Sequence, residues 1–403
     1  VTPENVSAET LSAPDVIANP YPYYAALRDQ SPIFGYSDLP PGTVPGQDAA
    51  PASWAVLVSD QVAHVARHPD IYSSRDPLQE ASGAPTLMLV NHDDPHHRNL
   101  RNLVQGAFTA SRVASHREWI AARVRELLEP HANREVDVMQ GLAADLPAIV
   151  MTRMLDMPQS DFPHFRRWAT AFMLSTPLTP GQRQASNEEM FAYFSAKVDE
   201  RIAAGADSDC FIDALVQAEF EGGALSREEV IRFCFTLVVA GSETTTGLLG
   251  NLVWLMATYP QEFQALKQYP ERIDGFIEEA LRFAGPPQRL FRIATQDTEL
   301  GGKTISKGDW VAIFFAAANH DPAAWDQPDE FLPGREGPRA HATFGQGVHS
   351  CLGSMLVRLE ARCAVEGICE LFSSVRPGQA PFVRQTATQL SYALDACPVI
   401  FES

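Results

Sequence analysis

The sequence predicts a mainly α-helical protein with scattered short strands. The strongest observation is a helical run that follows Gly222–Leu225 and stops at Thr258–Pro260. This run is roughly 32 residues long, or about 48 Å, enough to cross a domain of this size. Two further helical segments lie within Glu262–Arg282. The predicted strands are short: Trp54–Val58 alternates weakly, and strands within Leu300–Phe315 surround a Lys-Gly-Asp turn.

Three segments precede the first predicted strand: a tail, a short helix and a loop. Val1–Pro14 is polar and predicts a loose N-terminal tail. Pro20–Arg28 predicts a short helix that ends before Pro32. Asp38–Ser53 is rich in Pro, Gly and Ala, which predicts a loop. The sequence suggests no purpose for this loop.

The long helix has a clear start and an unusual centre. Ser226 and Glu229 have the spacing of a capping box. From Ile231 to Leu255 the run is almost entirely apolar, apart from polar residues at Ser242–Thr246. A helix that is apolar on every side is buried, so the polar groups in its centre need partners.

Composition excludes several classes of protein. Of 403 residues, 45% are hydrophobic, and the net charge is −19, from 50 acidic and 31 basic residues. This charge argues against nucleic acid and anionic membranes as partners. The sequence has neither a signal segment nor an apolar stretch of roughly 18 residues. Six cysteines lack the spacing of a disulfide scaffold. We therefore expect a cytoplasmic, bacterial protein of enzyme size with reduced thiols.

The segment Phe344–Gly353 carries the clearest chemical signal. It places Cys351 among small residues, just before an amphipathic run. A thiol at a helix N-terminus is stabilised as thiolate by the helix dipole and by backbone N–H groups. The glycines of this segment let the backbone fold closely around a large flat group. A single thiolate ligand from such a loop suits haem iron. The alternative is a buried structural cysteine.

A second signal lies in the centre of the long helix, at Ala240–Thr245. Threonine hydroxyls can bond the carbonyl four residues back, and Gly241 weakens the local ladder. The helix could open there into a groove for a diatomic ligand and water. The acid Glu243 and the adjacent hydroxyl of Thr244 would then form a proton relay. The alternative is ordinary back-bonding in a packed helix, with Glu243 in a salt bridge.

The pattern Phe-x-x-Gly-x-His-x-Cys-x-Gly at residues 344–353 resembles the haem-binding loop of bacterial cytochromes P-450. The resemblance extends from Asn19–Pro22 to near Pro398. It implies a single mainly-α domain over residues 1–403 with a small β-rich region. It also implies haem b between the long central helix and the cysteine-loop helix. Cys351 would be the iron ligand, and Glu243 and Thr244 the family's acid–alcohol pair.

The same resemblance implies a supporting set of residues. Those expected to contact the haem, through its propionates or the loop, are His97, Arg101, Arg292, His349, Phe344 and Gly345. Arg98 and Asn99 depart from the family's commoner Thr-Arg, which leaves the role of Arg98 open. Those expected to support the cysteine loop are Glu279, Arg282 and Arg335. From spacing alone, Glu279 and Arg282 would be a surface ion pair worth under about 1 kcal/mol.

The implied function is a monomeric haem-thiolate monooxygenase. It would insert one oxygen atom from O2 into a small hydrophobic substrate, by hydroxylation or O-dealkylation. The substrate pocket expected by family position comprises Leu87, Met88, Val239, Ala240, Leu290, Phe291, Leu390 and Ser391. Gln288 or Arg289 could instead anchor a polar end of the substrate. The chain has no flavin or dinucleotide fingerprint and no iron–sulfur cysteine cluster. Electrons should therefore come from a ferredoxin and its reductase.

The ferredoxin should dock over the cysteine loop. The arginines in segments expected near that face are Arg98, Arg112, Arg358 and Arg362.

Three other functions are weighed against this one. A peroxide-driven haem-thiolate peroxygenase usually lacks the acid–alcohol pair, so Glu243 and Thr244 argue against it. A non-catalytic haem sensor needs an output domain, and no segment is left to form one. A zinc site using His349 and Cys351 is the poorest, because no second ligand pair has the necessary spacing.

Overall fold

The computed structural model describes residues 2–35, 53–75, 87–172, 178–206, 211–217, 219–220, 223–335 and 340–403. The predicted loop Asp38–Ser53 therefore lies outside the described residues, apart from Ser53, which begins a strand. The chain forms two compact units. Unit 1 contains Val1–Arg98, Glu278–Cys351 and Gln385–Tyr392, and unit 2 contains Asn99–Ile277, Leu352–Arg384 and Ala393–Ser403. Because the segments alternate, the two units are not successive domains along the chain.

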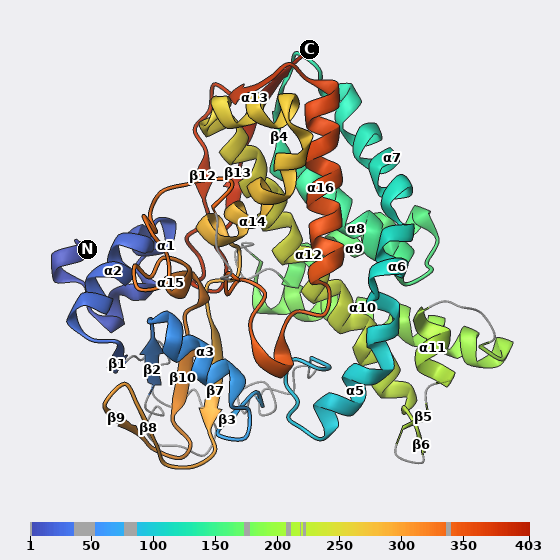
Figure 1. Ribbon diagram of the computed structural model, residues 1–403. Helices are drawn as coiled ribbons and strands as arrows, with labels where there is room; N and C mark the ends of the chain where they lie inside the picture. The colour runs from blue at the N-terminus through green and yellow to red at the C-terminus, as the bar shows by residue number, and fades with distance from the viewer. Residues whose placement is uncertain are drawn as a thin grey trace. The chain divides into compact units, whose positions relative to one another are not determined.

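Unit 1 is built on a five-stranded sheet with the order β1-β2-β10-β7-β3 (Figure 1). Only β2 and β10 pair in parallel; the other pairs are antiparallel. The strands of the unit are β1 (Ile33–Gly35), β2 (Ser53–Val56), β3 (Tyr72–Ser73), β7 (Leu290–Ala294), β8 (Thr298–Leu300), β9 (Lys303–Ile305) and β10 (Trp310–Ile313). Its helices are η1 (Pro3–Asn5), η2 (Ala8–Ser12), α1 (Pro14–Ala18), α2 (Tyr21–Gln30), α3 (Ser59–Arg67), α15 (Phe315–Asn319) and η8 (Gly347–His349), where η denotes a 3-10 helix.

The two faces of β10 enter two different parts of the core. Val311 and Ile313 pack with the buried face of α3. Ala312 and the following Phe314 pack with Leu11 and residues of α1 and α2. This division follows from the alternation of side chains along a strand. Leu11 is only 1% exposed, so the N-terminal segment is folded into the core and is not the loose tail expected from its polarity.

Unit 2 is mainly helical. Its helices are α5 (His96–Val104), η3 (Gln105–Phe108), α6 (Ala110–Ser115), α7 (Arg117–Leu128), η4 (Glu129–His131), η5 (Val138–Gln140), α8 (Leu142–Met154), η6 (Gln159–Asp161), α9 (Phe162–Phe172), α10 (Pro180–Ala204), α11 (Phe211–Gln217), α12 (Arg227–Thr258), α13 (Pro260–Gln268), η7 (Pro270–Arg272), α14 (Ile273–Ala284) and α16 (Ser354–Leu371). Its strands are β4 (Glu135–Asp137), β5 (Glu219–Phe220), β6 (Gly223–Ala224), β11 (Ser374–Pro377), β12 (Val383–Arg384), β13 (Leu394–Ala396) and β14 (Pro398–Glu402). Helices α5 and α14 each extend across the boundary with unit 1.

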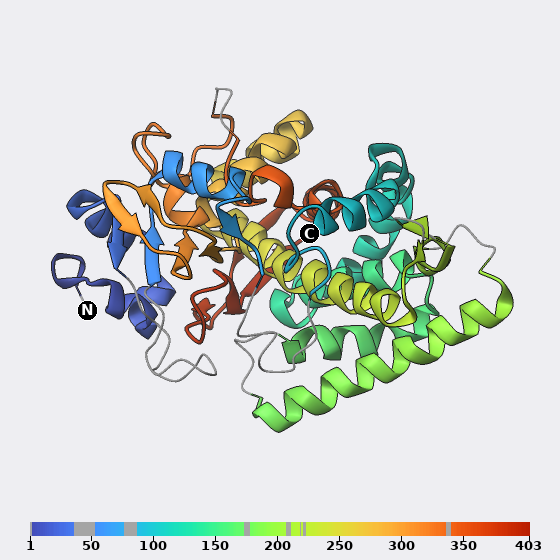
Figure 2. The same cartoon turned by 90° about the horizontal axis from the view of Figure 1, so that it is seen from below.

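The long helix α12 has the extent that the sequence predicts. Ser226 accepts the backbone N–H of Glu229, and the Glu229 side chain accepts the backbone N–H of Ser226, so the capping box is confirmed. The helix packs against α8, α9 and α10 (Figure 2). It also contacts α16, which runs beside α7 (Figure 1). These neighbours explain why the middle of α12 is apolar on nearly every side.

Several smaller expectations are also decided. The predicted helix at Pro20–Arg28 is α2, and the predicted strand at Trp54–Val58 is β2. The predicted turn lies between β9 and β10, where Gly308 has a φ of 91°. None of the five described cysteines forms a disulfide. No helix in the described ranges has both the length and the apolarity that crossing a bilayer requires.

Candidate functional site

The cysteine loop is held in a tight conformation at the end of unit 1. Gly345 and Gly347 have φ values of 68° and 72°, a region that other residues rarely adopt. A Cβ on Gly347 would overlap the carbonyl oxygen of Ala66 on α3. The Cys351 N–H donates to the Phe344 carbonyl at 2.8 Å, which closes the loop. Cys351 is exposed, and α16 begins three residues later, so the thiol precedes a helix N-terminus as expected.

Two of the expected haem-binding histidines lie together. The rings of His97 and His349 have centroids 4.1 Å apart, and His97 is almost fully buried. Nδ1 of His97 lies 3.4 Å from Oδ1 of Asp94. Arg101 is four residues after His97 on α5, on the same face of the helix. The unassigned Arg98 is exposed, and its guanidinium pairs with Asp94 at 2.7 Å.

Arg292 on β7 supplies a buried positive charge. It is only 7% exposed, and burial lowers its pKa to about 10, while Asp93 opposes this shift. The carboxylate of Asp93 also accepts the Ser73 hydroxyl and the Ser74 N–H. The charge of Arg292 is thus only partly compensated within unit 1. A buried, partly compensated guanidinium fits a carboxylate such as a haem propionate, because such groups bind it in a charge-assisted hydrogen bond.

The acid–alcohol pair lies where two successive threonines of α12 bond back to the helix. The hydroxyl of Thr244 donates to the Ala240 carbonyl at 3.1 Å, and that of Thr245 donates to the Gly241 carbonyl at 2.8 Å. Two successive carbonyls therefore accept side-chain bonds, a pattern that tends to bend a helix. Ala240 is exposed although it lies in the middle of α12. The structure has continuous α-helix through residues 240–246, so the expected opening of the helix stays a prediction.

Glu243 is poised to exchange a proton near neutral pH. Burial raises its pKa to about 7, while the positive charge of Arg183 on α10 opposes the shift. Arg183 also donates to the carbonyl of Ala171, in the last turn of α9, at 2.6 Å. The alternative of a salt-bridged structural acid would keep Glu243 ionised well below neutral pH. Arg183 could not be identified from the sequence, because it lies sixty positions before Glu243 and only the tertiary structure brings its charge near.

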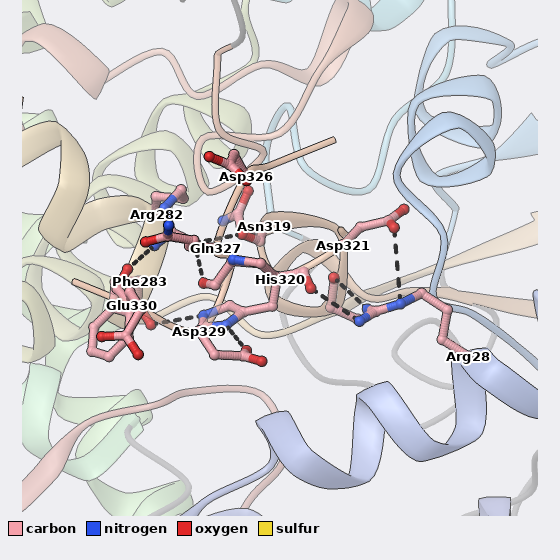
Figure 3. A network of polar contacts seen from close by, with 12 residues as sticks. Arg28, Arg282, Phe283, Asn319, His320, Asp321, Asp326, Gln327, Asp329 and Glu330 are labelled. Carbon is pink, nitrogen blue, oxygen red and sulfur yellow. Dashed lines mark hydrogen bonds and ion pairs between the residues drawn. The ribbon is translucent and has the colours of Figure 1, made fainter. Parts of the chain in front are cut away.

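Glu279 and Arg282 form a buried pair, in contrast to the surface pair that spacing alone suggests. Arg282 donates through Nε and Nη2 to both carboxylate oxygens of Glu279, each at 2.8 Å. Arg335 donates to the same carboxylate at 2.9 Å. Arg282 also binds the carbonyls of Asn319, Pro328 and Glu330, as Figure 3 shows in part.

The network extends to α2. His320 lies between Asp329 and the Phe283 carbonyl, each 3.0 Å away, and Arg28 donates to the His320 carbonyl (Figure 3). The effect is to tie the end of α14 to the segment after α15.

Two further residues position the cysteine loop and were missed from the sequence. The side-chain oxygen of Asn319 accepts the Ala342 N–H at 2.6 Å. The Thr343 hydroxyl donates to the Leu281 carbonyl at 2.6 Å. Thr343 immediately precedes the motif that begins at Phe344, so its position was the one available signal.

The expected pocket residues have very different exposures. Leu290 and Leu390 are 42% and 36% exposed, and their segments are joined where the Gln288 N–H donates to the Leu390 carbonyl at 3.0 Å. Phe291 and Leu87 are partly buried, and Ala240 is exposed. Met88, Val239 and Ser391 are buried, so they are less accessible to a ligand. Val239 and Ala240 belong to unit 2 and the other six to unit 1.

Gln288 and Arg289, which could anchor a polar substrate end, both make contacts inside unit 1. Arg289 donates to the Gln389 side chain at 2.9 Å and lies over the ring of Phe291. Gln288 donates to the Gly285 carbonyl at 3.1 Å. Both side chains are almost fully buried.

Comparisons with known proteins agree with these observations. The family model described as Cytochrome P450 matches residues 151–390. Cytochrome P450 monooxygenase PikC of Streptomyces venezuelae is 33% identical over 382 residues, which cover 91% of this chain and 88% of that protein. Erythromycin C-12 hydroxylase of Saccharopolyspora erythraea is 35% identical over 328 residues, covering 77% and 82%. The structure of cytochrome P450 CYP109Q5 from Chondromyces apiculatus matches with a TM-score of 0.86 at 27% identity, covering 97% of each chain.

Proposed function

The chain belongs to the cytochrome P450 family and is a monooxygenase with a haem cofactor, and on this premise we propose which residues carry its activity. Cys351 is the thiolate ligand of the haem iron. His97, Arg101, Arg292 and His349 bind the propionates. Glu243 and Thr244 handle protons. The observation that carries the proposal is the cysteine loop, with positive-φ glycines, the ring of His349 close to that of His97, and a helix beginning just after the thiol.

The haem, when bound, supplies the activation of O2 and the transfer of one of its oxygen atoms to carbon, the other leaving as water. The residues of the chain provide what surrounds that chemistry. The α16 N-terminus and the loop N–H groups stabilise negative charge on the Cys351 sulfur. Glu243, with a pKa of about 7, can accept a proton from water and pass it on near neutral pH. The Thr244 hydroxyl, one residue further along α12, can donate to the same relay by turning away from the Ala240 carbonyl, its acceptor in this structure.

We propose a neutral, mostly apolar organic substrate, hydroxylated or O-dealkylated by the enzyme. Leu290 and Leu390 present exposed apolar side chains from segments that a backbone hydrogen bond joins. Arg289 and Gln288, the polar groups nearest to them in the sequence, are bound elsewhere. A carboxylate on the substrate would therefore lack an evident partner in this segment. One relative of this chain is named for hydroxylating erythromycin, an organic molecule.

We also propose a separate ferredoxin-type electron donor in the cytoplasm of a bacterium. The sequence lacks a flavin or dinucleotide fingerprint and an iron–sulfur cysteine cluster. Two other uses of the haem make different predictions. A peroxygenase would form product with hydrogen peroxide and without a ferredoxin pair. A sensor would bind gas or change redox state without substrate-dependent NADH consumption.

The decisive test of the site is Cys351→Ser. The reduced, carbon monoxide-bound protein should show the red-shifted Soret band of thiolate-ligated haem, and the variant should lose it. Cys369→Ser makes the same chemical change on α16 and should keep the band. An unchanged spectrum in Cys351→Ser would overturn the ligand assignment. Substrate-dependent NADH consumption with a ferredoxin pair then separates a monooxygenase from a peroxygenase and from a sensor. Candidate substrates are identified by the change in the haem spectrum when they displace the water bound to the iron.

A further inference from the structure

Two glycines of α12 each receive a methionine thioether from a neighbouring element. A Cβ added to Gly241 would lie 2.8 Å from Sδ of Met151 on α8, and one added to Gly250 would overlap Sδ of Met139 on η5. Both methionines are buried. At either position a Cβ would force the methionine side chain to move, because it would lie within 3.0 Å of the sulfur. The two contacts are chemically alike, and both lie within unit 2.

They differ in where they meet α12. Met151 presses on the backbone at Gly241, whose carbonyl accepts the Thr245 hydroxyl at 2.8 Å. The preceding carbonyl accepts the Thr244 hydroxyl. Met139 meets the helix nine residues later, about 13 Å along its axis. Only the Met151 contact therefore coincides with the proposed proton-handling residues.

This part of α12 needs lateral support. Glycine is a weak helix former, and threonines that bond backwards compete with the helical ladder and bend it. A methionine side chain is flexible and polarisable, so it can fill the irregular notch beside Gly241. The thioether is the nearest side-chain atom to that notch.

We propose that Met151 is a positioning residue for proton delivery. Its thioether, seated on Gly241, holds α12 in the conformation in which Glu243 and Thr244 act. This inference rests on the proposed roles of those two residues. Without the contact, the segment fluctuates and admits water, so electrons are diverted to hydrogen peroxide.

The test compares two matched pairs of variants of the haem-loaded enzyme. Met151→Ala and Gly241→Ala should raise the ratio of peroxide to product by about three- to tenfold, the upper value being equivalent to about 1.4 kcal/mol between the competing steps. Met139→Ala removes the equivalent contact at Gly250, and Gly250→Ala crowds it. Each should change the ratio of peroxide to product by less than about twofold. Met151→Leu preserves volume and should resemble wild type. In the double variant Gly241→Ala/Met151→Ala, the new methyl group occupies the space left by the thioether, so the effects should not add.

A second readout does not depend on turnover. Amide hydrogen exchange across residues 240–246 should be faster in Met151→Ala than in wild type, and unchanged in Met139→Ala. Both methionine variants should lose thermal stability, because each leaves a buried cavity. A purely structural role for Met151 would lower stability without changing exchange or coupling selectively. Should Met151→Ala fail to bind haem, Met151→Val and Met139→Val replace the alanine pair.

The outcomes separate this inference from the proposed function. If Thr244→Ala uncouples the enzyme and Met151→Ala behaves as Met139→Ala does, the positioning role is overturned and the relay stands. If Thr244→Ala leaves coupling intact, the relay fails, and the role of Met151 fails with it. Selective uncoupling and faster exchange in Met151→Ala, reversed in Met151→Leu, support the inference.

Discussion

The side-chain amide of Asn319 donates to the hydroxyl oxygen of Thr343 at 2.9 Å, and this bond links α15 to the residue that precedes the cysteine loop. Thr343 in turn donates to the Leu281 carbonyl. All three groups are buried. The loop that presents Cys351 is therefore anchored to α14 and α15 before its own glycines begin.

Thr343→Val should weaken this anchor. The variant keeps the shape of the side chain but leaves the Asn319 amide and the Leu281 carbonyl without the Thr343 hydroxyl. Leaving buried polar groups unsatisfied costs about 1–3 kcal/mol, which denaturant unfolding would measure. Haem transfer to an acceptor protein should also be faster. Thr258→Val removes an exposed threonine back-bond at the end of α12 and is the control. Equal losses in both variants would contradict the anchoring role.

Thr244→Ala should retain haem and substrate binding but divert electrons to peroxide. The reason is the loss of a donor beside Glu243, in a helix whose other central residues are mostly apolar. Ordered water can partly replace one donor, so product formation should fall by about 10²-fold or less. The measurement is the ratio of product formed to NADH consumed. Thr236→Ala removes the same kind of back-bond two turns earlier and should leave this ratio unchanged.

Glu243→Gln should stabilise the fold selectively above acidic pH. Because burial raises the pKa of Glu243 from 4.5 to about 7, the unfolded chain releases this proton first as pH rises. Wild type should therefore lose stability relative to the variant between about pH 4.5 and 7, by at most about 3 kcal/mol, with a constant gap at higher pH. Urea unfolding of both proteins at several pH values measures the gap.

Burial also raises the pKa of Glu360, to about 8. Its contribution to the pH dependence is the same in wild type and Glu243→Gln, so it cancels when the two stability curves are subtracted. Arg183→Gln removes a positive charge that favours ionised Glu243. In proteins that carry Arg183→Gln, the pH range over which Glu243 lowers stability should therefore extend to higher pH. Glu402→Gln is the control. Hydrogen bonds from Ser374 and Arg376 lower the pKa of Glu402, so its contribution changes only below pH 4.5. A gap for Glu243→Gln that does not depend on pH would show that Glu243 is not buried as an acid.

The parts of this fold that the sequence predicted are those with local signals. The capping box at Ser226 and the stop at Pro260 define α12 by contacts within a few residues. Glu279 and Arg282 are only three residues apart, so their pairing could also be predicted. Their burial could not, because it depends on segments distant in the chain. The N-terminal segment was misjudged, because its polarity hid Leu11 and Val6, whose partners lie in β2 and beside β10.

The site divides in the same way. Cys351, Glu243 and Thr244 were found because they belong to compact motifs. Met151, Arg183 and Asn319 were not, since each acts through a contact that only the tertiary structure creates. The family resemblance further predicts a mobile roof over the substrate pocket at Phe172–Leu174, and this segment lies outside the described residues after Phe172.

The four arginines expected to attract a ferredoxin differ in the charge that they offer. Arg98 pairs with Asp94, and Arg362 pairs with Asp274 and Glu366. These acids neutralise much of their field. Arg112 is exposed on α6, and Arg358 is partly exposed on α16, against which α6 packs. Arg112 is therefore the better candidate in a chain of net charge −19, and Arg358 is tested with it because α16 packs against α6.

Arg112→Ala and Arg358→Ala should each slow reduction by a ferredoxin without changing substrate affinity. Complementary charges raise the rate of encounter, and salt screens them, so the variants should also show a weaker dependence on ionic strength. Stopped-flow reduction across a range of salt concentrations measures both effects. Arg376→Ala is the control: Arg376 lies beyond the far end of α16, a helix about 27 Å long. Wild-type rates and salt slopes for Arg112→Ala and Arg358→Ala would place the donor elsewhere, or indicate docking through apolar contacts, since an electrostatic encounter at this surface cannot ignore the loss of its exposed cations.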